Sequence, residues 1–444
     1  MKRILTFFLV LGLLTGVSAP VHAEIKEDII PLDTLMLYSS NYLLMDQDDG
    51  TILAQNNGYE RVSPASITKV LTVITALEMM ESQNISLQET YLIPDEVFDG
   101  LSSIASIADF DRGDTVVLED VLYGIMLPSG ADATRTLSMR LTGDPEGLSK
   151  YMNELAMRIG MTNSNFENTS GLDDENHYST PYELALLVQY ALRNETFKKI
   201  YTTETHTTKP LINHPDGISF TNLSLYKARN LGSKTLKGAK SGYTENAERA
   251  LSSVASKDGT NLIFISTNAP NEETESTAVL DAVNVYNRVF DDFNKTTVIN
   301  AKTIIKEIPV TYSKEDFPVI FENDVTTYLP KDLSLDDVIV TVTPASTEFV
   351  APVEAGTVMG TLTISYSNKI VHEQTLLATD TIPVRLSKVL LDYCIAILKI
   401  VGIAILILIA LIFMIREINR ARYRKRRERR RAEIMKRRAQ QQNE

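Results

Sequence analysis

The chain has 444 residues, of which 44% are hydrophobic and 23% are charged. This apolar content excludes an intrinsically disordered protein, and the length allows two domains with substantial cores. The single cysteine excludes an intrachain disulfide. The net charge of −13 disfavours a protein that binds polyanions.

The first 23 residues have the pattern of a secretory signal peptide. Lys2 and Arg3 precede the apolar stretch "ILTFFLVLGLLTGVSA", and Val21-His22-Ala23 places small side chains where a signal peptidase reads them. We expect residues 1–23 to be removed after export, with an uncleaved membrane anchor as the alternative.

Strand and helix patterns alternate through residues 24–300. Residues 37–57 form two apolar runs around "DDG", which predicts a hairpin. A helix is expected after Ser66, because Val70, Ile74 and Leu77 recur at helical spacing. Further helices are expected at 118–126, 132–141, 145–159, 181–193 and 277–293, and two strands at 250–267. Strands at both ends with helices between them predict a mixed α/β (α+β) domain whose sheet joins distant parts of the chain.

The residue composition and pattern change at about residue 301. Stretches such as "DVIVTVTP" and "TVMGTLTISYSN" are rich in β-branched residues, alternate in polarity and are broken by Pro, Gly and Asn. This pattern predicts a small all-β module at residues 301–385.

A second apolar segment lies near the C-terminus. Residues 393–415 contain one charge, Lys399, and as a helix would be about 34 Å long, enough to cross a hydrocarbon core of about 30 Å. We therefore expect a membrane-anchoring linker and transmembrane helix at residues 386–415.

A basic tail, residues 416–444, follows this segment. Residues 416–438 hold 13 Lys or Arg and 3 Glu, and positive residues beside a span mark the cytoplasmic side. The sequence thus predicts one span in the cell membrane, a large extracytoplasmic part and a short tail inside. The exported part carries about 24 excess negative charges and argues against nucleic acid, whereas the tail could contact anionic lipid headgroups or, less readily, nucleic acid.

Ser66 and Lys69 are three residues apart at the start of the expected helix. Residues at this spacing share a helix face, so the lysine ammonium can reach the serine hydroxyl. Lysine can act as a base towards serine when burial or nearby positive charge lowers its pKa. An S-x-x-K tetrad alone is weak support, since an exposed helix start with a serine cap gives the same pattern.

Two other segments carry polar residues of the same kind. "MLPSGADAT" places Ser129, Gly130 and Ala131 before an expected helix, and "LKGAKSGYT" places Lys240 and Ser241 on an expected strand. Taken singly, the first is an ordinary turn with a helix cap and the second a strand that ends in a glycine turn. The order and separation of the three segments make a shared site the better interpretation.

These segments resemble S-x-x-K, S-x-N and K-T/S-G of the serine penicillin-recognising enzymes. Within that superfamily, "SPASITKVLTVITAL", "DVLYGIMLPSGADA" and "AKSGYTENA" are similar to the low-molecular-mass D-alanyl-D-alanine carboxypeptidases of bacterial cell-wall metabolism. The resemblance covers about residues 35–380. It implies an antiparallel sheet flanked by helices, a C-terminal β-sandwich, no cofactor and no metal.

The resemblance also implies roles for the matched residues. Ser66 would be the nucleophile, Lys69 its base, and Ser129 a proton relay to the leaving group. In the K-T/S-G segment, Lys240 would supply positive charge and Ser241 would bind the terminal carboxylate of a stem peptide. Gly242 would let the strand approach the substrate, and the backbone N–H groups of Ser66 and Tyr243 would form the oxyanion hole. Release of the terminal D-alanine would proceed through a Ser66 acyl-enzyme, which β-lactams would trap.

The chain departs from the family pattern in two places. Ala131 replaces the S-x-N asparagine, and loss of one hydrogen bond to a charged group costs about 1.5–3 kcal/mol, or roughly 10- to 150-fold in rate. Asp132 could compensate, although a carboxylate beside Lys69 would raise the lysine pKa. The arginine expected about 35 residues after the K-T/S-G lysine is replaced by "NAPNEETES", and Arg249 is the nearer basic residue.

Three alternatives to an active carboxypeptidase stay open, and the two departures support the first. A catalytically impaired protein that binds stem peptides or penicillin is the main one. A β-lactamase is less favoured, because no dedicated deacylation base stands out, and an endopeptidase acting on cross-links stays open.

The five histidines show no metal-ligand spacing, and residues 178–180 resemble a helix N-cap.

Overall fold

The computed structural model describes residues 28–271 and 276–441, so the expected signal peptide lies outside the described residues. The chain divides into two compact units, each described by itself. The first contains the chain up to Val298 with Thr326–Ile339 and Ser365–His372, and the second contains Ile299–Val325, Val340–Ile364 and the chain from Glu373 onwards.

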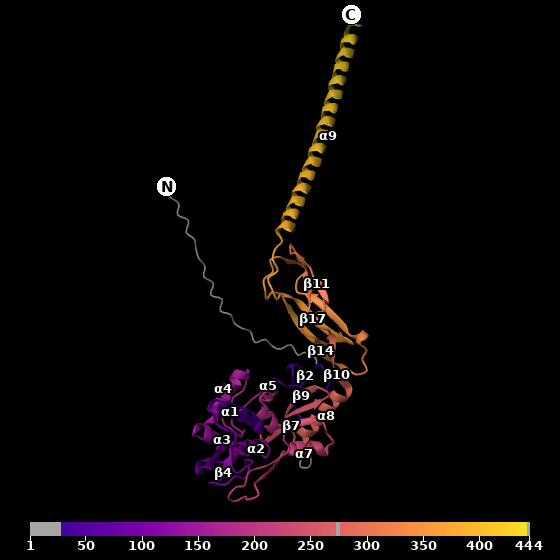
Figure 1. Ribbon diagram of the computed structural model, residues 1–444. Helices are drawn as coiled ribbons and strands as arrows, with labels where there is room; N and C mark the ends of the chain where they lie inside the picture. The colour runs from indigo at the N-terminus through magenta and orange to yellow at the C-terminus, as the bar shows by residue number, and fades with distance from the viewer. Residues whose placement is uncertain (1–27, 272–275, 442–444) are drawn as a thin grey trace, which may run out of the picture. The chain divides into compact units, whose positions relative to one another are not determined.

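A five-stranded antiparallel sheet lies at the centre of the first unit, in the order β2-β1-β9-β8-β7 (Figure 1). Its first strand pairs with β2 across the predicted "DDG" turn and, along its whole length, with β9. The sheet therefore joins the two ends of this unit's main segment, as the sequence predicts. Its strands are β1 (Asn41–Asp46), β2 (Ile52–Asn56), β7 (Leu236–Thr244), β8 (Glu248–Lys257) and β9 (Thr260–Ala269).

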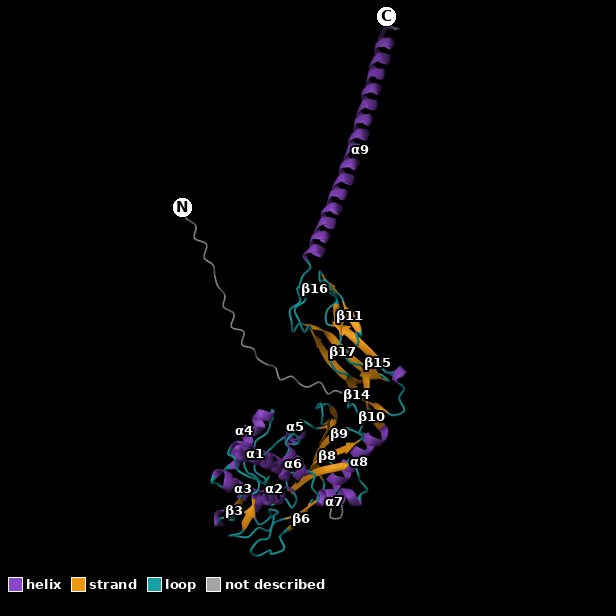
Figure 2. Cartoon of the chain, in the orientation of Figure 1, coloured by secondary structure: helices purple, strands orange, loops and turns teal. Residues whose placement is uncertain are grey.

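Helices cover both faces of this sheet (Figure 2). Side chains of alternate strand residues pack into two different cores. Ile263 and Ile265 pack with α1 to α6, while Leu262 and Phe264 pack with α7 and α8. This division follows from the two-residue period of a strand. The helices are α1 (Thr68–Ser82), α2 (Leu118–Met126), α3 (Ala131–Thr142), α4 (Leu148–Ile159), α5 (Pro181–Ala191), α6 (Glu195–Tyr201), α7 (Leu223–Asn230) and α8 (Thr277–Asp292).

Short elements connect these helices. Two small hairpins pair β3 (Thr90–Leu92) with β4 (Thr115–Val117), and β5 (Thr205–Thr207) with β6 (Ser219–Thr221). Single turns of 3-10 helix occur at η1 (Ala65–Ile67) and η2 (Asp95–Val97). The first of these precedes α1 directly and contains Ser66.

One expected helix starts later than its sequence pattern indicates. The helix expected from Pro145 begins at Leu148, because Asp144 folds the preceding residues into a turn. Its carboxylate accepts from the Glu146 N–H at 2.9 Å and its carbonyl from the Gly147 N–H at 3.2 Å. The expected N-cap is present: the Thr180 side chain accepts from the Glu183 N–H at the start of α5.

After α8 the chain forms strands up to Leu377, apart from one 3-10 turn, as expected from its composition. The strands form a three-stranded sheet, β15-β17-β18, and three pairs, β10-β14, β11-β13 and β12-β16. They are β10 (Phe293–Ile299), β11 (Lys306–Ile308), β12 (Val310–Thr311), β13 (Phe317–Val319), β14 (Val325–Pro330), β15 (Ile339–Pro344), β16 (Phe349–Val350), β17 (Val358–Tyr366) and β18 (Lys369–Leu377), with η3 (Leu335–Asp337).

The last element is a long helix, α9 (Leu386–Gln441), of 56 residues. It contains the apolar segment 393–415 and continues through the basic residues that follow. Among the described residues it is the one helix long and apolar enough to cross a membrane. It is therefore the candidate for the expected anchor.

Candidate active site

Ser66 lies in η1, at the point where the chain enters α1. The preceding Ala65 has a φ of +45°, a conformation that costs a non-glycine residue about 1–3 kcal/mol and persists only where the surroundings fix it. Lys69 lies on the first turn of α1, and its Nζ donates to Ser66 Oγ at 3.0 Å. The structure thus brings the two residues of the tetrad into direct contact.

Lys69 is buried, with 3% of its surface exposed. Its Nζ also donates to the Ser170 carbonyl at 2.6 Å. Burial lowers the pKa of Lys69 to about 7, and this effect outweighs the opposing charges of Asp132 and Glu146. A substantial fraction of the lysine is therefore neutral near pH 7 and able to accept a proton.

The loop at residues 168–172 supplies the second partner of Lys69. The Asn168 side-chain oxygen accepts from the backbone N–H groups of Ser170, Gly171 and Leu172, which closes the loop into a tight turn. Gly171 has a φ of +84°, and a Cβ there would lie 1.9 Å from the Ala65 carbonyl oxygen. Only glycine therefore allows this loop to lie against η1.

His177 contacts Thr68, the first residue of α1. Its Nδ1 accepts from the Glu167 N–H at 3.1 Å, so its Nε2 donates to Thr68 Oγ1, 2.8 Å away. Burial lowers the pKa of His177 to about 4, which keeps the ring neutral. The sequence analysis assigned no role to Ser170 or His177; the one signal for them is their place in "NTSGLDDENHYST", residues 168–180.

Ser129 precedes α3 with a φ of +69°. Its Oγ accepts from Lys240 Nζ at 2.9 Å, and the same Nζ donates to the Ser241 carbonyl at 2.8 Å. Burial and the charge of Lys69 hold the pKa of Lys240 well below its usual range. Among the described residues, Ser129 makes no hydrogen bond to Ser66 or Lys69, so the site contains two separate serine–lysine pairs.

Strand β7 packs directly against η1. A Cβ on Gly242 would lie 2.5 Å from the Ser66 backbone nitrogen, so glycine is needed for this approach. The neighbouring Ser241 is half-buried, and Tyr243 is 47% exposed. The backbone of β7 therefore runs beside the Ser66 N–H.

The two departures from the family pattern can be placed in the structure. Ala131 is buried at the start of α3, where its N–H donates to the Ser106 carbonyl at 2.8 Å. Arg249 lies opposite Tyr243 on β8, with its guanidinium 5.3 Å from the centre of the tyrosine ring. Arg249 Nε donates to Asn271 Oδ1 at 2.8 Å, and residues 272–275 of the acidic segment lie outside the described range.

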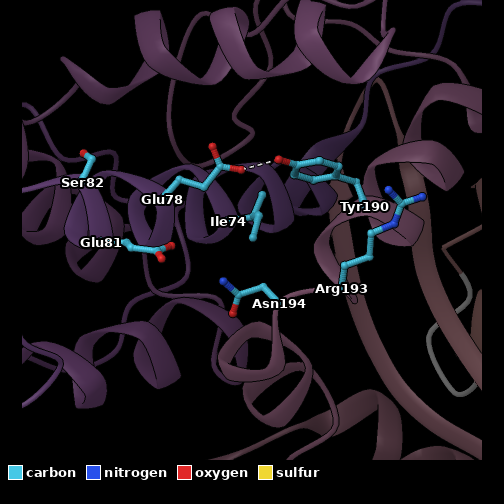
Figure 3. Close-up of a pocket in the computed structure, with 7 residues that line it drawn as sticks. All are labelled: Ile74, Glu78, Glu81, Ser82, Tyr190, Arg193 and Asn194. Atoms are coloured by element: carbon cyan, nitrogen blue, oxygen red, sulfur yellow. Dashed lines mark hydrogen bonds between the residues drawn. The ribbon is translucent and has the colours of Figure 1, made fainter.

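A pocket of about 630 Å³ lies at the other end of α1, away from Ser66 (Figure 3). Tyr190 OH donates to Glu78 Oε1 at 2.6 Å across it, and Arg158 also pairs with Glu78. Its lining contains none of the residues that the sequence places in the site. The part of the chain with described coordinates contains no group of three His, Cys, Asp or Glu side chains that could hold a metal ion.

Comparison with known proteins identifies the class. Residues 31–271, more than half of the chain, match the family described as D-alanyl-D-alanine carboxypeptidase. Residues 293–384 match the family described as the C-terminal domain of penicillin-binding protein 5. The chain therefore belongs to the D-alanyl-D-alanine carboxypeptidase family, and it is a serine-type peptidase of the low-molecular-mass penicillin-binding class.

Similarity to individual relatives extends over most of the chain. It is 24% identical to D-alanyl-D-alanine carboxypeptidase DacF of Bacillus subtilis over 383 residues, covering 86% of this chain and 94% of the relative. It is 25% identical to DacA of Escherichia coli, covering 78% and 84%.

Solved structures show the same fold. Penicillin-binding protein 5 of Haemophilus influenzae superposes with a TM-score of 0.63 at 24% identity, covering 78% of this chain and 98% of that one. DacD of Francisella tularensis gives 0.64 at 19% identity, covering 83% and 99%. The predicted fold class is confirmed.

Proposed function

We propose that the protein removes the terminal D-alanine from peptidoglycan stem peptides through a Ser66 acyl-enzyme. The observation that carries this proposal is the contact between Ser66 Oγ and the buried Lys69 Nζ, 3.0 Å apart. A serine hydroxyl becomes a good nucleophile when an adjacent base takes its proton. Lys69, with its pKa lowered to about 7, is suited to that task.

The reaction proceeds in two steps. Lys69 Nζ takes the hydroxyl proton as Ser66 Oγ attacks the carbonyl between the two D-alanines. The C–N bond then breaks, a proton passes to the departing amine, and the terminal D-alanine leaves. Water attacks the resulting ester, which regenerates the Ser66 hydroxyl and releases the shortened peptide. Ser129, which accepts a hydrogen bond from Lys240, would pass the proton to the amine.

Residues of β7 would hold the substrate. Lys240 would supply positive charge once a bound carboxylate offsets the burial that lowers its pKa, and Ser241 would supply a hydroxyl for that carboxylate. The N–H groups of Ser66 and Tyr243 would receive the oxyanion. The contact of Gly242 with Ser66 supports this arrangement, because it brings the β7 backbone to the nucleophile. Arg249, beside the Tyr243 ring, is the arginine we propose for the carboxylate in place of the one missing downstream.

Penicillins and other β-lactams would acylate Ser66 by the same attack. The alternative, a protein that is acylated but turns over slowly, rests on Ala131, whose methyl group cannot replace an asparagine side chain. The two functions share a fold and differ only in the rate of the second step or of peptide attack.

We further propose the arrangement in the cell. Residues 1–23 would direct export, 24–300 would form the catalytic domain, 301–385 the β-sandwich, and 386–415 the linker and transmembrane helix. The basic tail, 416–444, would lie in the cytoplasm, because positive residues stay on that side. The catalytic domain would then face the cell wall, where stem peptides are found.

The experiment uses the full-length protein in detergent micelles. It is incubated first with a fluorescent penicillin and separately with diacetyl-L-Lys-D-Ala-D-Ala, and D-alanine release is measured. We expect labelling and release, both abolished in Ser66→Ala. Labelling without release would establish the binding protein instead, and equal labelling of Ser66→Ala would refute both functions.

A further inference from the structure

We propose that Asp132 is a positioning residue for this reaction: its carboxylate fixes the loop at residues 98–110 against the Ser129 segment and supplies a buried negative charge to the Ser66–Lys69 site. The inference rests on the proposed function. Asp132 follows Ala131 on the first turn of α3, and only 1% of its surface is exposed.

Both carboxylate oxygens of Asp132 bind the backbone of the 98–110 loop. Oδ1 accepts from the Ala108 N–H at 2.7 Å, and Oδ2 accepts from the Phe110 N–H at 3.2 Å. The Ala131 N–H donates to the Ser106 carbonyl at 2.8 Å, which adds a third bond. One end of the loop is therefore attached to the first turn of α3.

Arg135, one helical turn further along α3, holds the other end of the loop. It donates to the carbonyls of Val97 and Asp99, each at 2.6 Å, and pairs with Glu146 at 2.9 Å. Between the two attachments the loop has little packing of its own, since Ile104 is 86% exposed. Its position depends on the attachments rather than on a core.

The attached loop lies directly against the Ser129 segment. A Cβ on Gly130 would be 2.7 Å from Ala108 Cβ and 2.8 Å from the Ala108 nitrogen. Ser129 itself has a left-handed φ, which only its surroundings can maintain. Release of Ala108 would therefore loosen the residue that receives the Lys240 hydrogen bond.

The charge of Asp132 acts on Lys69 independently of the loop. Among the described residues, four titratable groups interact with Lys69. Asp132, whose own pKa is raised by burial, and Glu146 raise the pKa of Lys69. Lys240 is also buried, and His177 is neutral because burial lowers its pKa to about 4. Asp132 is the larger of the two raising influences. Removing its charge lowers the pKa of Lys69 further, so the neutral base persists to lower pH.

The direction of this change in the Lys69 pKa distinguishes a residue that supplies charge to the site from a residue with a purely structural role. The test measures kcat/KM for D-alanine release from diacetyl-L-Lys-D-Ala-D-Ala against pH, with the full-length protein in micelles. For Asp132→Asn we expect kcat to fall about 10- to 150-fold, the factor for one lost bond to a charged group, and the acid limb to move to lower pH. An acid limb that stays in place or moves to higher pH would overturn the proposal.

Two further variants separate the effect of the Asp132 charge from the effect of the loop attachment. Asp132→Glu keeps the charge but displaces the oxygens, so kcat should fall while the acid limb stays in place. Arg135→Gln frees the other end of the loop and keeps the charge of Asp132. Chymotrypsin should therefore cleave within residues 98–110 faster than in the unmodified protein, with no downward movement of the acid limb. Unchanged cleavage in both Arg135→Gln and Asp132→Asn would refute the attachment of the loop.

The role of Asp132 can be tested even if the protein does not turn over the peptide. If the unmodified protein is labelled by fluorescent penicillin but releases no D-alanine, the proposed function fails. The pH dependence of Ser66 acylation then tests Asp132 with the same expected direction.

Discussion

At the scale of single residues, burial dominates the chemistry of the site. Lys69 and Lys240 are each 3% exposed, and each donates a hydrogen bond to a serine. Burial disfavours the charged form of an ammonium group, so both lysines have lowered pKa values. The fold thus places a proton acceptor beside Ser66 without any histidine.

The first prediction concerns pH. The neutral form of Lys69 accepts the serine proton, and its pKa is about 7, so protonation removes the base as the pH falls. We expect kcat/KM to decrease about tenfold per pH unit below about pH 6, the behaviour of one essential base. A profile that stays flat down to pH 5 would mean that Lys69 does not act as the base.

The second prediction concerns Ala131. An asparagine there would restore one hydrogen bond in the site, so Ala131→Asn should raise kcat by about 10-fold or more. The measurement is D-alanine release at saturating peptide. Ala131→Val, a change of size without a polar group, is the control and should not raise kcat. An unchanged or lower rate in Ala131→Asn would show that the surroundings have adapted to alanine.

At the scale of elements, the site depends on three backbones that approach one another closely. The η1 turn is contacted by the 168–172 loop through Gly171 and by β7 through Gly242. These contacts bring together side chains from segments that are distant in the sequence. Glycine at both contacts is therefore as necessary as the reactive side chains.

The third prediction tests one of these contacts. In Gly242→Ala the new methyl group would lie 2.5 Å from the Ser66 nitrogen and 2.8 Å from Ala65 Cβ, so β7 must move away from η1. A shift of about 1 Å can cost roughly 100-fold in rate, and we expect a loss of that order in penicillin acylation. Gly259→Ala is the control: its methyl group would meet nothing within 4 Å, and the strain from its φ of +84° falls on the β8–β9 turn, so acylation should stay unchanged. Equal acylation in both variants would contradict the role of this contact.

Sequence reasoning was most successful where local chemistry decides the structure. The "DDG" turn predicts the first hairpin because glycine and aspartate favour tight turns, and periodicity locates α1 and α2. It also places Ser66 beside Lys69, since three residues on a helix fix that distance.

The missed features depend on tertiary contacts. The Ser170 carbonyl reaches Lys69 only because Asn168 and Gly171 shape a loop that packs on another element. The partner of Ser129 likewise depends on where β7 lies relative to α3. Single-sequence patterns carry no information about such distances, so the roles of the site residues remain predictions.

At the scale of the whole molecule, the chain combines a catalytic sheet, a set of small β-sheets and a long C-terminal helix. The side chains of the apolar part of α9 are exposed along its length, and a helix that is hydrophobic all round needs an apolar environment. A membrane is the environment that we propose for residues 393–415.

The fourth prediction tests this assignment. Ending the chain after residue 385 should move the protein from the membrane fraction to the soluble fraction, as followed with the penicillin label. Ending it after residue 415 retains the apolar segment and should leave the protein in the membrane fraction. A soluble product in both cases, or a membrane-bound product in both, would contradict anchoring by α9.

The pairing of β1 with β9 has a consequence for biogenesis. A ribosome makes residues 41–46 early, but their hydrogen-bonding partners at residues 262–267 emerge only after the intervening helices. Such long-range pairing is slow to form, and until it forms Ser66 and Lys240 have no common framework. Under the proposed export, a polypeptide that crosses the membrane before β1 and β9 pair would assemble its serine–lysine pairs only on the far side.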